Sequence, residues 1–297
     1  MKVFDCFMYF DEDLLLDVRL HTLDKYVDFF IIVESKYNHN GEARSLKFQI
    51  SKFQKFKHKI IYLVQKDEPK EIYKIKKEDS EKIKSDKYIL NAIKRENSQR
   101  NYISFGLDKA EKNDWIIISD LDEVPKLENF NFKDIKSKFI FFKQHMIYYK
   151  LNLKYNNFLW IGSKACKKKD LQSPQWLRNI KDRNYPLWRV DTLFSDNKYN
   201  NINFIEDGGW HFSYIKTPEQ IEHKLKSYLH HREYDLNPIG VDKIKKLIND
   251  KKAIYNLRHD QRSLNKIGSG EKLVKIELNN LPNYIKENMQ KFNNWLE

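Results

Sequence analysis

The feature of the chain that most constrains its fold is an uncharged apolar run at residues 115–119, WIIIS, which ends at once in the acidic segment DLDE. A short continuous apolar run bounded by polar residues is typical of a buried strand. Because side chains alternate along a strand, Asp120 and Asp122 should leave it on one face while Leu121 points toward the core. The pattern predicts a buried strand that delivers two carboxylates to the end of a sheet.

Two carboxylates at this spacing can hold one hard divalent cation, Mn²⁺ or Mg²⁺, through their oxygen atoms. Such a cation, left partly open, can neutralise a diphosphate leaving group as its bond to a sugar breaks. The D-x-D spacing alone is weak, because it also occurs in solvated acidic loops. The preceding strand favours the metal site, and we expect Asp120 and Asp122 to be its ligands.

Further apolar runs at residues 2–10, 27–35 and 58–65 alternate with helical patterns near residues 16–23 and 46–56. Strands that alternate with helices predict an α/β fold with a mostly parallel central sheet flanked by helices. Ligands bind such sheets beyond the carboxyl ends of the strands.

Three of the expected strands are followed by an acid at that edge, namely Asp11, Glu34 and Asp120. These acids either contact a bound ligand and its cation or are solvated in loops. The buried strands before them favour the first interpretation.

A helix is expected over residues 89–111, with an apolar stripe that includes Leu90 and Ile93 and ends at Leu107. Arg100 falls on the same stripe, and a guanidinium that points inward needs an anionic partner. That partner could be a core carboxylate or the phosphates of a ligand, so both roles stay open.

The middle of the chain is rich in aromatic side chains. Residues 139–153 predict one long strand or one arm of a hairpin. Residues 154–205 combine Trp, Tyr, Asn and basic residues, which suits sugar binding as well as an irregular aromatic core.

The segment GGWHFSYI, residues 208–215, predicts a strand with Trp210 and Phe212 on one face and His211 on the other. An isolated His is usually structural. Because Gly208 and Gly209 lead into the strand, His211 is a better candidate ligand than an average histidine.

Residues 217–229 predict a helix that begins with a capping box between Thr217 and Gln220. Helical patterns at residues 241–250 and 281–296 predict that the C-terminal part is helical as well.

Composition favours one soluble domain. The 297 residues include only 8 Gly and 7 Pro, and 14% are aromatic, which argues against long disordered segments. Cys6 and Cys166 are too few for a disulfide framework or a zinc site and fit a reducing compartment. Because the chain shows no signal-peptide pattern and no run of about 18 apolar residues, we expect a cytoplasmic protein.

Lys and Arg outnumber Asp and Glu by 55 to 42, giving a net charge of +13. This charge can attract nucleotide phosphates or bring the protein into peripheral contact with an anionic membrane. The lysines are spread along the chain, and no dense Arg stripe with interleaved aromatics marks a nucleic-acid groove. We expect no nucleic-acid partner.

Several segments, taken in order, resemble glycosyltransferase family 17. They are DCFMYFDEDLLLDVRL, VDFFIIVES, NGEARSLKF, RENSQRN, IIISDLDEVP and GGWHFSY. The resemblance covers about residues 3–235, and SDLDE together with GGWHFSY is specific as a pair.

The resemblance implies a GT-A-like, Rossmann-like fold formed by one domain, residues 1–297. Within it, residues 1–125 would form the nucleotide-sugar-binding half, residues 126–235 the acceptor and catalytic half, and residues 236–297 a helical extension. The implied reaction moves a sugar with inversion from a UDP-sugar, such as UDP-N-acetylglucosamine, onto a glycan or a lipid-linked saccharide.

The same resemblance places Asp120 and Asp122 on the family's D-x-D metal motif. His211 stands where GT-A enzymes often have a further metal ligand. Arg100 and Glu34, with Asp11 and Asp120 at the same sheet edge, would help to bind the nucleotide.

An inverting transfer also needs a carboxylate that takes the proton of the acceptor hydroxyl. Glu206 and Asp207 precede the GGWH turn, and Glu233 follows the capped helix. Asp207 is preferred because its loop adjoins His211.

Two other functions fit parts of the sequence. IIISDLDEV also satisfies the nucleophile motif of haloacid-dehalogenase phosphotransferases, with Asp120 attacking phosphorus and Asp122 acting as the acid. That fold needs a second acidic pair, and no Asp-Asp or Gly-Asp-x-x-x-Asp follows residue 123. A non-enzymatic, basic polyanion-binding protein would rest on the net charge alone.

Overall fold

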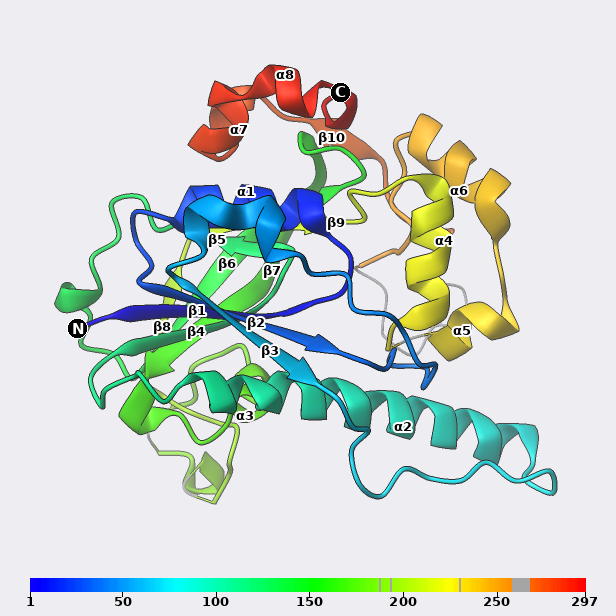
Figure 1. The fold of residues 1–297 in the computed structure, drawn as a ribbon, viewed down its shortest axis with the longest axis horizontal. Coiled ribbons are helices and arrows are strands. Elements are labelled where there is room, and N and C mark those ends of the chain that lie inside the picture. The colour runs from blue at the N-terminus through cyan, green and yellow to red at the C-terminus, as the bar shows by residue number, and fades with distance from the viewer. Residues whose placement is uncertain (187, 193, 230, 258–267) are drawn as a thin grey trace.

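A single mixed sheet organises the structure, a computed structural model that describes residues 1–186, 188–192, 194–229, 231–257 and 268–297 (Figure 1). The strands, in their order across the sheet, are β3 (Ile60–Gln65), β2 (Phe29–Ser35), β1 (Val3–Tyr9), β4 (Trp115–Asp120), β7 (Leu153–Lys167), β6 (Phe139–Tyr148), β9 (Gly209–Ser213) and β5 (Glu123–Pro125), while β8 (Ile202–Ile205) pairs with β6 and β10 (Leu273–Lys275) with β7.

The sheet has a parallel half and a half in which both directions occur. Strands β3, β2, β1 and β4 are parallel neighbours, whereas β7 runs antiparallel to both β4 and β6. Strands β6 and β7 are joined by a turn of only a few residues, which allows no parallel crossover. The α/β class is confirmed, but the expectation of a mostly parallel sheet holds only for the first half. The run at residues 139–153 is one arm of the β6–β7 hairpin.

Helices cover both faces of the sheet (Figure 1). The helices are α1 (Asp13–Leu23), α2 (Glu81–Asn101), α3 (Pro174–Asn179), α4 (Pro218–Ser227), α5 (His231–Leu236), α6 (Gly240–Asn249), α7 (Asn283–Glu287) and α8 (Met289–Phe292). One face carries α1, α7 and α8, and the other carries α2 and α3. Helices α4 and α6 pack against the aromatic ends of β6 and β7.

Alternate side chains of the buried strands enter different cores, which explains the continuous apolar runs. In β2, Phe30 and Ile32 pack in the core beneath α1, whereas Ile31 and Val33 pack in the core on the other face. Leu121 is buried in the same core as Ile117, as the strand alternation predicts.

The helix expected over residues 89–111 differs from the observed one. Helix α2 begins at Glu81 and ends at Asn101, and a short 3₁₀ helix continues to Gly106. Leu90 and Ile93 are 44% and 36% exposed, because α2 turns Asn91 and Ala92 inward at this level, with exposed fractions of 4% and 0%. The outer part of α2 also extends beyond the sheet (Figure 1). The predicted stripe is therefore wrong at these two positions.

The structure confirms some of the other predicted helices and differs at others. The helix near residues 46–56 is a 3₁₀ helix, Ile50–Phe56. Helix α4 begins with the predicted capping box, in which Thr217 and Gln220 each bond the other's backbone. The C-terminal part contains α6, α7 and α8, and also the short strand β10.

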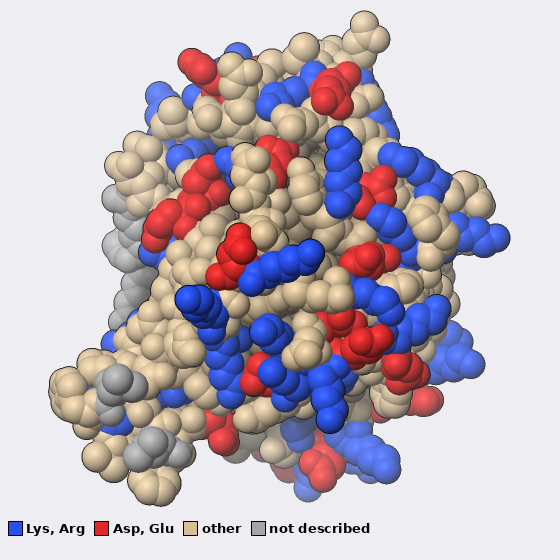
Figure 2. Space-filling model, turned by 90° about the vertical axis from the view of Figure 1, so that its left-hand side faces the viewer, with Lys and Arg blue, Asp and Glu red and all other residues tan. Residues whose placement is uncertain are grey.

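Surface charge is mixed on the face drawn in Figure 2, where Lys and Arg side chains are interspersed with Asp and Glu. The net charge of +13 therefore forms no single positive band on this face. Within the described ranges, no helix combines the length and the apolar character that crossing a membrane requires.

Arg19 of α1 ties the core to the acidic turn after β4. Its side chain and that of Asp5 in β1 are both 0% exposed, and the guanidinium bonds both carboxylate oxygens of Asp5 at 2.6 and 2.7 Å. Nη1 of Arg19 also donates to the carbonyl oxygens of Asp120, Leu121 and Glu123 at 3.1, 3.1 and 2.6 Å. One buried guanidinium therefore fixes the backbone that carries the D-x-D pair.

We predict that Arg19→Leu lowers the free energy of unfolding by about 3–5 kcal/mol, because it leaves the Asp5 carboxylate buried without a partner. Arg19→Lys should rescue little, since an ammonium cannot form the paired bonds of a guanidinium. Denaturant unfolding measures both effects. Lys52→Met, which removes an exposed pair with Asp13, is the control and should cost no more than about 1 kcal/mol. Equal losses in Arg19→Leu and Lys52→Met would contradict the anchoring role of Arg19.

Candidate active site

A cleft of about 530 Å³ lies beyond the carboxyl ends of β1 and β4, between the two halves of the sheet. The charged and aromatic side chains that line it include Tyr9, Phe10, Glu12, Tyr37, Arg44, Glu96, Arg100, Asp120, Asp122, Trp160, Arg178, His211, Tyr214, Lys224 and Tyr228. The sequence-predicted residues Arg100, Asp120, Asp122 and His211 meet here, although they come from α2, the end of β4 and β9.

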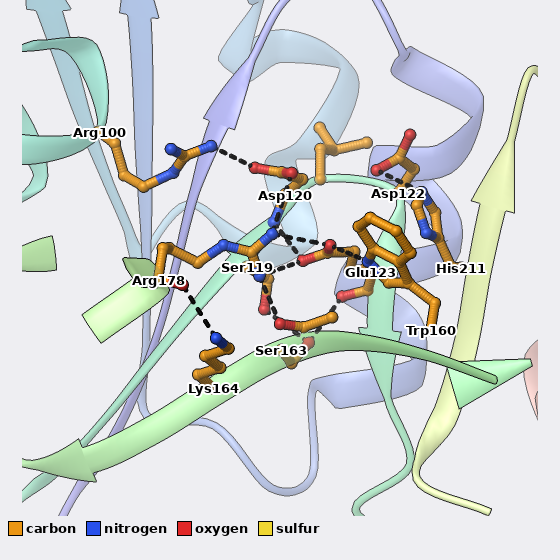
Figure 3. A network of polar contacts seen from close by, with 12 residues as sticks. Arg100, Ser119, Asp120, Asp122, Glu123, Trp160, Ser163, Lys164, Arg178 and His211 are labelled. Carbon is orange, nitrogen blue, oxygen red and sulfur yellow. Dashed lines mark hydrogen bonds and ion pairs between the residues drawn. The ribbon is translucent and has the colours of Figure 1, made fainter. Parts of the chain in front are cut away.

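Asp120 is held between two guanidinium groups (Figure 3). Nη2 of Arg100 lies 2.9 Å from one carboxylate oxygen, and Nη2 of Arg178 lies 3.3 Å from the other. Burial raises the pKa of Asp120, but Arg178 and Arg100 lower it more, so the pKa lies well below its usual range. Asp120 is therefore ionised at neutral pH. Its carboxylate is an anionic partner of the inward-pointing Arg100, whose partner the sequence left open.

Asp122 faces a different pair of partners. Its Oδ1 lies 3.5 Å from Nε2 of His211, and its Oδ2 lies 3.4 Å from Nζ of Lys224. Burial lowers the pKa of His211, but the Asp122 carboxylate raises it more, so the net pKa lies above its ordinary value. His211 and Asp122 are thus electrostatically coupled at one end of the cleft.

Gly209 explains how β9 brings His211 to this position. Its φ is +126°, and a Cβ there would fall 2.2 Å from the carbonyl oxygen of Val124 in the neighbouring strand. Only glycine fits this close approach. The register then sets His211 opposite Glu123, while Trp210 and Phe212 pack in the core.

Glu123 lies behind the cleft lining and positions two of its side chains, a role that the sequence did not reveal. Its carboxylate is 0% exposed and accepts four hydrogen bonds. The donors are the backbone N–H of Asp120 at 2.8 Å, Nε1 of Trp160 at 2.8 Å, and both Nη atoms of Arg178 at 2.8 and 2.9 Å (Figure 3). Glu123 therefore fixes an arginine and an indole that arrive from distant parts of the chain.

The short helix α3, which carries Arg178, is held at its end by Lys164 of β7. Nζ of Lys164 donates to the carbonyl oxygens of Arg178 and Ile180 at 2.9 and 2.6 Å. Burial lowers the pKa of Lys164 to about 8. These bonds satisfy carbonyl groups that a helix end leaves without partners.

Glu12 and Lys224 are also cleft residues that sequence reasoning missed. Oε1 of Glu12 lies 3.6 Å from Nζ of Lys224 and 3.8 Å from Nζ of Lys216. Burial raises the pKa of Glu12, but Lys216 and Lys224 lower it more, so Glu12 is a carboxylate at neutral pH. Glu12 is the middle acid of the DED segment; Lys224 had no motif to mark it.

Asp11 and Glu34, expected at the same sheet edge, do not line the cleft. Asp11 pairs with Lys216. Glu34 is 0% exposed and accepts bonds from the backbone N–H groups of Lys47 and Phe48. The Glu34 carboxylate thus holds the loop that contains Lys47 and Phe48 against the sheet and does not face the cleft.

The three candidate bases also lie apart from the D-x-D pair. Asp207 and Glu206 sit in the β8–β9 turn, with side chains 59% and 67% exposed. Asp207 contacts Lys126 and Glu206 contacts Lys143, and neither acid lines the cleft. Glu233 is in the first turn of α5, outside the cleft lining.

The charges of the cleft balance one another. Its described lining contains four carboxylates and four groups that stay cationic at neutral pH. The carboxylates are Glu12, Glu96, Asp120 and Asp122, and the cations are Arg44, Arg100, Arg178 and Lys224. Leaving the histidines aside, the charges of these eight groups sum to zero.

Comparison with known families gives this arrangement a context. The family model described as glycosyltransferase family 17 matches residues 1–297. The chain belongs to glycosyltransferase family 17. A member of this family is a glycosyltransferase enzyme, and the match supports neither the phosphotransferase nor the polyanion-binding alternative.

Two animal proteins illustrate the relationship. The chain is 26% identical to the human and to the rat beta-1,4-mannosyl-glycoprotein 4-beta-N-acetylglucosaminyltransferase, over 72% of its own length. The match spans 40% of the length of these relatives.

Within this family 17 chain, we predict that Asp122→Asn lowers the pKa of His211, because the variant removes the negative charge that raises it. NMR titration of the histidine ring protons in the metal-free protein measures the change. Asp207→Asn is the matched control, since Asp207 contacts His145 and not His211. An unchanged His211 pKa in Asp122→Asn would contradict the coupling.

The sign of the linked stability effect follows from the raised pKa. The protonated pair contributes stability that is fully present below the unfolded His pKa of about 6.5. This contribution is lost as the pH rises through the raised folded pKa of His211. The stability difference between wild type and Asp122→Asn should therefore shrink with increasing pH in that window.

Proposed function

We propose that the chain is a metal-dependent inverting glycosyltransferase with a GT-A-like fold, which uses a UDP-sugar donor and a glycan acceptor. The observation that carries the proposal is the charge balance of the cleft together with the Asp122–His211 pair. A nucleoside diphosphate sugar brings a diphosphate, and the cationic side chains are already matched by carboxylates. A divalent cation would restore neutrality once the diphosphate binds.

Asp122 and His211 suit such a cation in donor type and in spacing. Carboxylate oxygen and imidazole nitrogen both bind Mn²⁺, and ligand atoms 3.5 Å apart can share an ion that lies about 2.1 Å from each. The described residues contain no group of three or more His, Cys, Asp or Glu able to hold a metal ion. In the proposed site, donor phosphates and water would therefore have to supply the remaining ligands. When bound, the ion would stabilise negative charge on the departing diphosphate.

In this proposal the donor lies across the D-x-D pair. Arg100 and Arg178 flank Asp120, so their positive charges would lie close to the bound diphosphate. Tyr37 and His39 line the end of the cleft next to β2, where the nucleoside would bind, and His211 lies at the sugar end. The parallel half of the sheet thus supplies the nucleotide site, which supports a GT-A-like arrangement.

The donor and acceptor are proposed from the relatives. Both are named for moving N-acetylglucosamine onto a mannosyl glycoprotein, so UDP-N-acetylglucosamine is the donor to test first. A glycan, free or lipid-linked, is the acceptor class. A cytoplasmic location remains a prediction.

Glu12 is the base that fits the cleft best. Glu96 pairs with Arg100 at 2.7 Å and Asp120 with two guanidinium groups, whereas no guanidinium of the described residues pairs with Glu12. Glu12 has two ammonium groups at 3.6 and 3.8 Å, and its Oε2 accepts the backbone N–H of Asp11 at 3.1 Å. In the proposed step, Glu12 takes the proton of the acceptor hydroxyl and the oxygen attacks the anomeric carbon. The bond to the β-phosphate oxygen breaks, and the nucleoside diphosphate leaves with the electron pair.

The function is tested by a donor-hydrolysis screen over nucleotide sugars, with and without Mn²⁺. We expect metal-dependent release of UDP, and Asp122→Asn should reduce it by about 10²-fold or more, because metal stabilisation of the leaving group is worth several kcal/mol. Asp191→Asn, on an exposed loop that does not line the cleft, is the matched control. Equal turnover in EDTA and in Mn²⁺ would refute metal dependence.

The base is tested by amide substitution. We predict that Glu12→Gln lowers turnover by roughly 10²- to 10⁴-fold while calorimetry shows donor binding retained. Asp207→Asn and Glu233→Gln should keep most of the activity, since neither residue lines the cleft. Loss of turnover in Asp207→Asn but not in Glu12→Gln would restore the assignment made from sequence.

A further inference from the structure

Trp160 occupies a defined place within the cleft. It comes from β7, lines the cleft and is half-buried. Its ring centroid lies 5.4 Å from that of His211, with the two ring planes inclined by 56°. Figure 3 shows the indole beside His211 and Asp122, on the side away from Arg100.

The orientation of this indole is fixed before any ligand binds. Nε1 donates to Oε1 of Glu123 at 2.8 Å, and the same carboxylate is clamped by both Nη atoms of Arg178. The Glu123 side chain is 0% exposed, so this anchor does not exchange with solvent. A large aromatic surface held in one orientation binds a ligand at a low cost in conformational entropy.

From this geometry we propose that Trp160 is the platform on which the transferred sugar of the donor stacks. The inference rests on the proposed function, in which the diphosphate lies over Asp120 and Asp122. The sugar follows the β-phosphate directly, so it meets the side chain next to His211, which is Trp160. A pyranose ring presents a face of C–H groups that packs on an aromatic ring, while its hydroxyls remain hydrogen-bonded elsewhere.

The proposal makes Trp160 a specificity-determining residue. It distinguishes a nucleotide sugar from the free nucleotide, because UDP has no group that reaches the indole. Glu123 is the positioning residue, since it holds the indole without lining the cleft itself.

The test compares two ligands by calorimetry in Mn²⁺, UDP and UDP-N-acetylglucosamine. Trp160→Leu should weaken UDP-N-acetylglucosamine by about tenfold or more and change UDP by less than about twofold. Trp160→Phe keeps an aromatic face but loses the bond to Glu123, so it should fall between wild type and Trp160→Leu. It also supplies a folded variant if the leucine variant is unstable.

Tryptophan fluorescence gives a second measurement. Quenching by UDP-N-acetylglucosamine should be present in wild type and strongly reduced in Trp160→Phe. Trp188→Phe is the matched control, because Trp188 is 79% exposed and does not line the cleft. Its quenching signal should equal that of wild type.

The outcomes separate this inference from the proposed function. If wild type binds both ligands but Trp160→Leu and Trp160→Phe lose UDP and UDP-N-acetylglucosamine equally, Trp160 only supports the cleft and the platform role is refuted. Wild-type protein that binds neither ligand contradicts the proposed function, and the platform role falls with it. Selective loss of the sugar nucleotide establishes the role.

Discussion

The acidic turn after β4 can exist only because each of its carboxylates is paired with a cation from another part of the chain. Asp120, Asp122 and Glu123 are neighbours in sequence and would repel one another. Arg178 neutralises Asp120 and Glu123, and Lys224 lies beside Asp122. The packing of α2, α3 and α4 around the cleft follows from this requirement, since each of these helices delivers at least one of the cations.

The apolar patterns were enough to predict the first half of the fold. Strands β1 to β4 are continuous apolar runs in the sequence because both of their faces are buried. Periodicity failed in α2, where Asn91 and Ala92 face the protein while Leu90 and Ile93 face solvent. For residues 139–153 it left one long strand and one arm of a hairpin both open, because an apolar run of this length is compatible with either.

Sequence patterns predicted those site residues that lie together in one motif. They missed single residues that reach the cleft from separate elements. Asp120 and Asp122 are adjacent to a diagnostic strand, and His211 follows two glycines. Arg178 lies 55 residues from Glu123, within the aromatic and basic stretch 154–205, for which the sequence left sugar binding and core packing both open. Glu34 has the right place in sequence, but its loop folds back to take up the carboxylate, a tertiary outcome that no local pattern encodes.

The buried pair of Arg19 and Asp5 also has a consequence for the order of folding. The two residues are 14 positions apart, whereas Arg19 reaches carbonyl groups 101 to 104 positions further along the chain. Local contacts form early and distant ones late, because closing a long loop costs entropy before any contact compensates. We therefore expect the contact of Arg19 with Asp5 to form before its contacts with the acidic turn. The shape of the acidic turn thus depends on a binding surface formed within the first 20 residues.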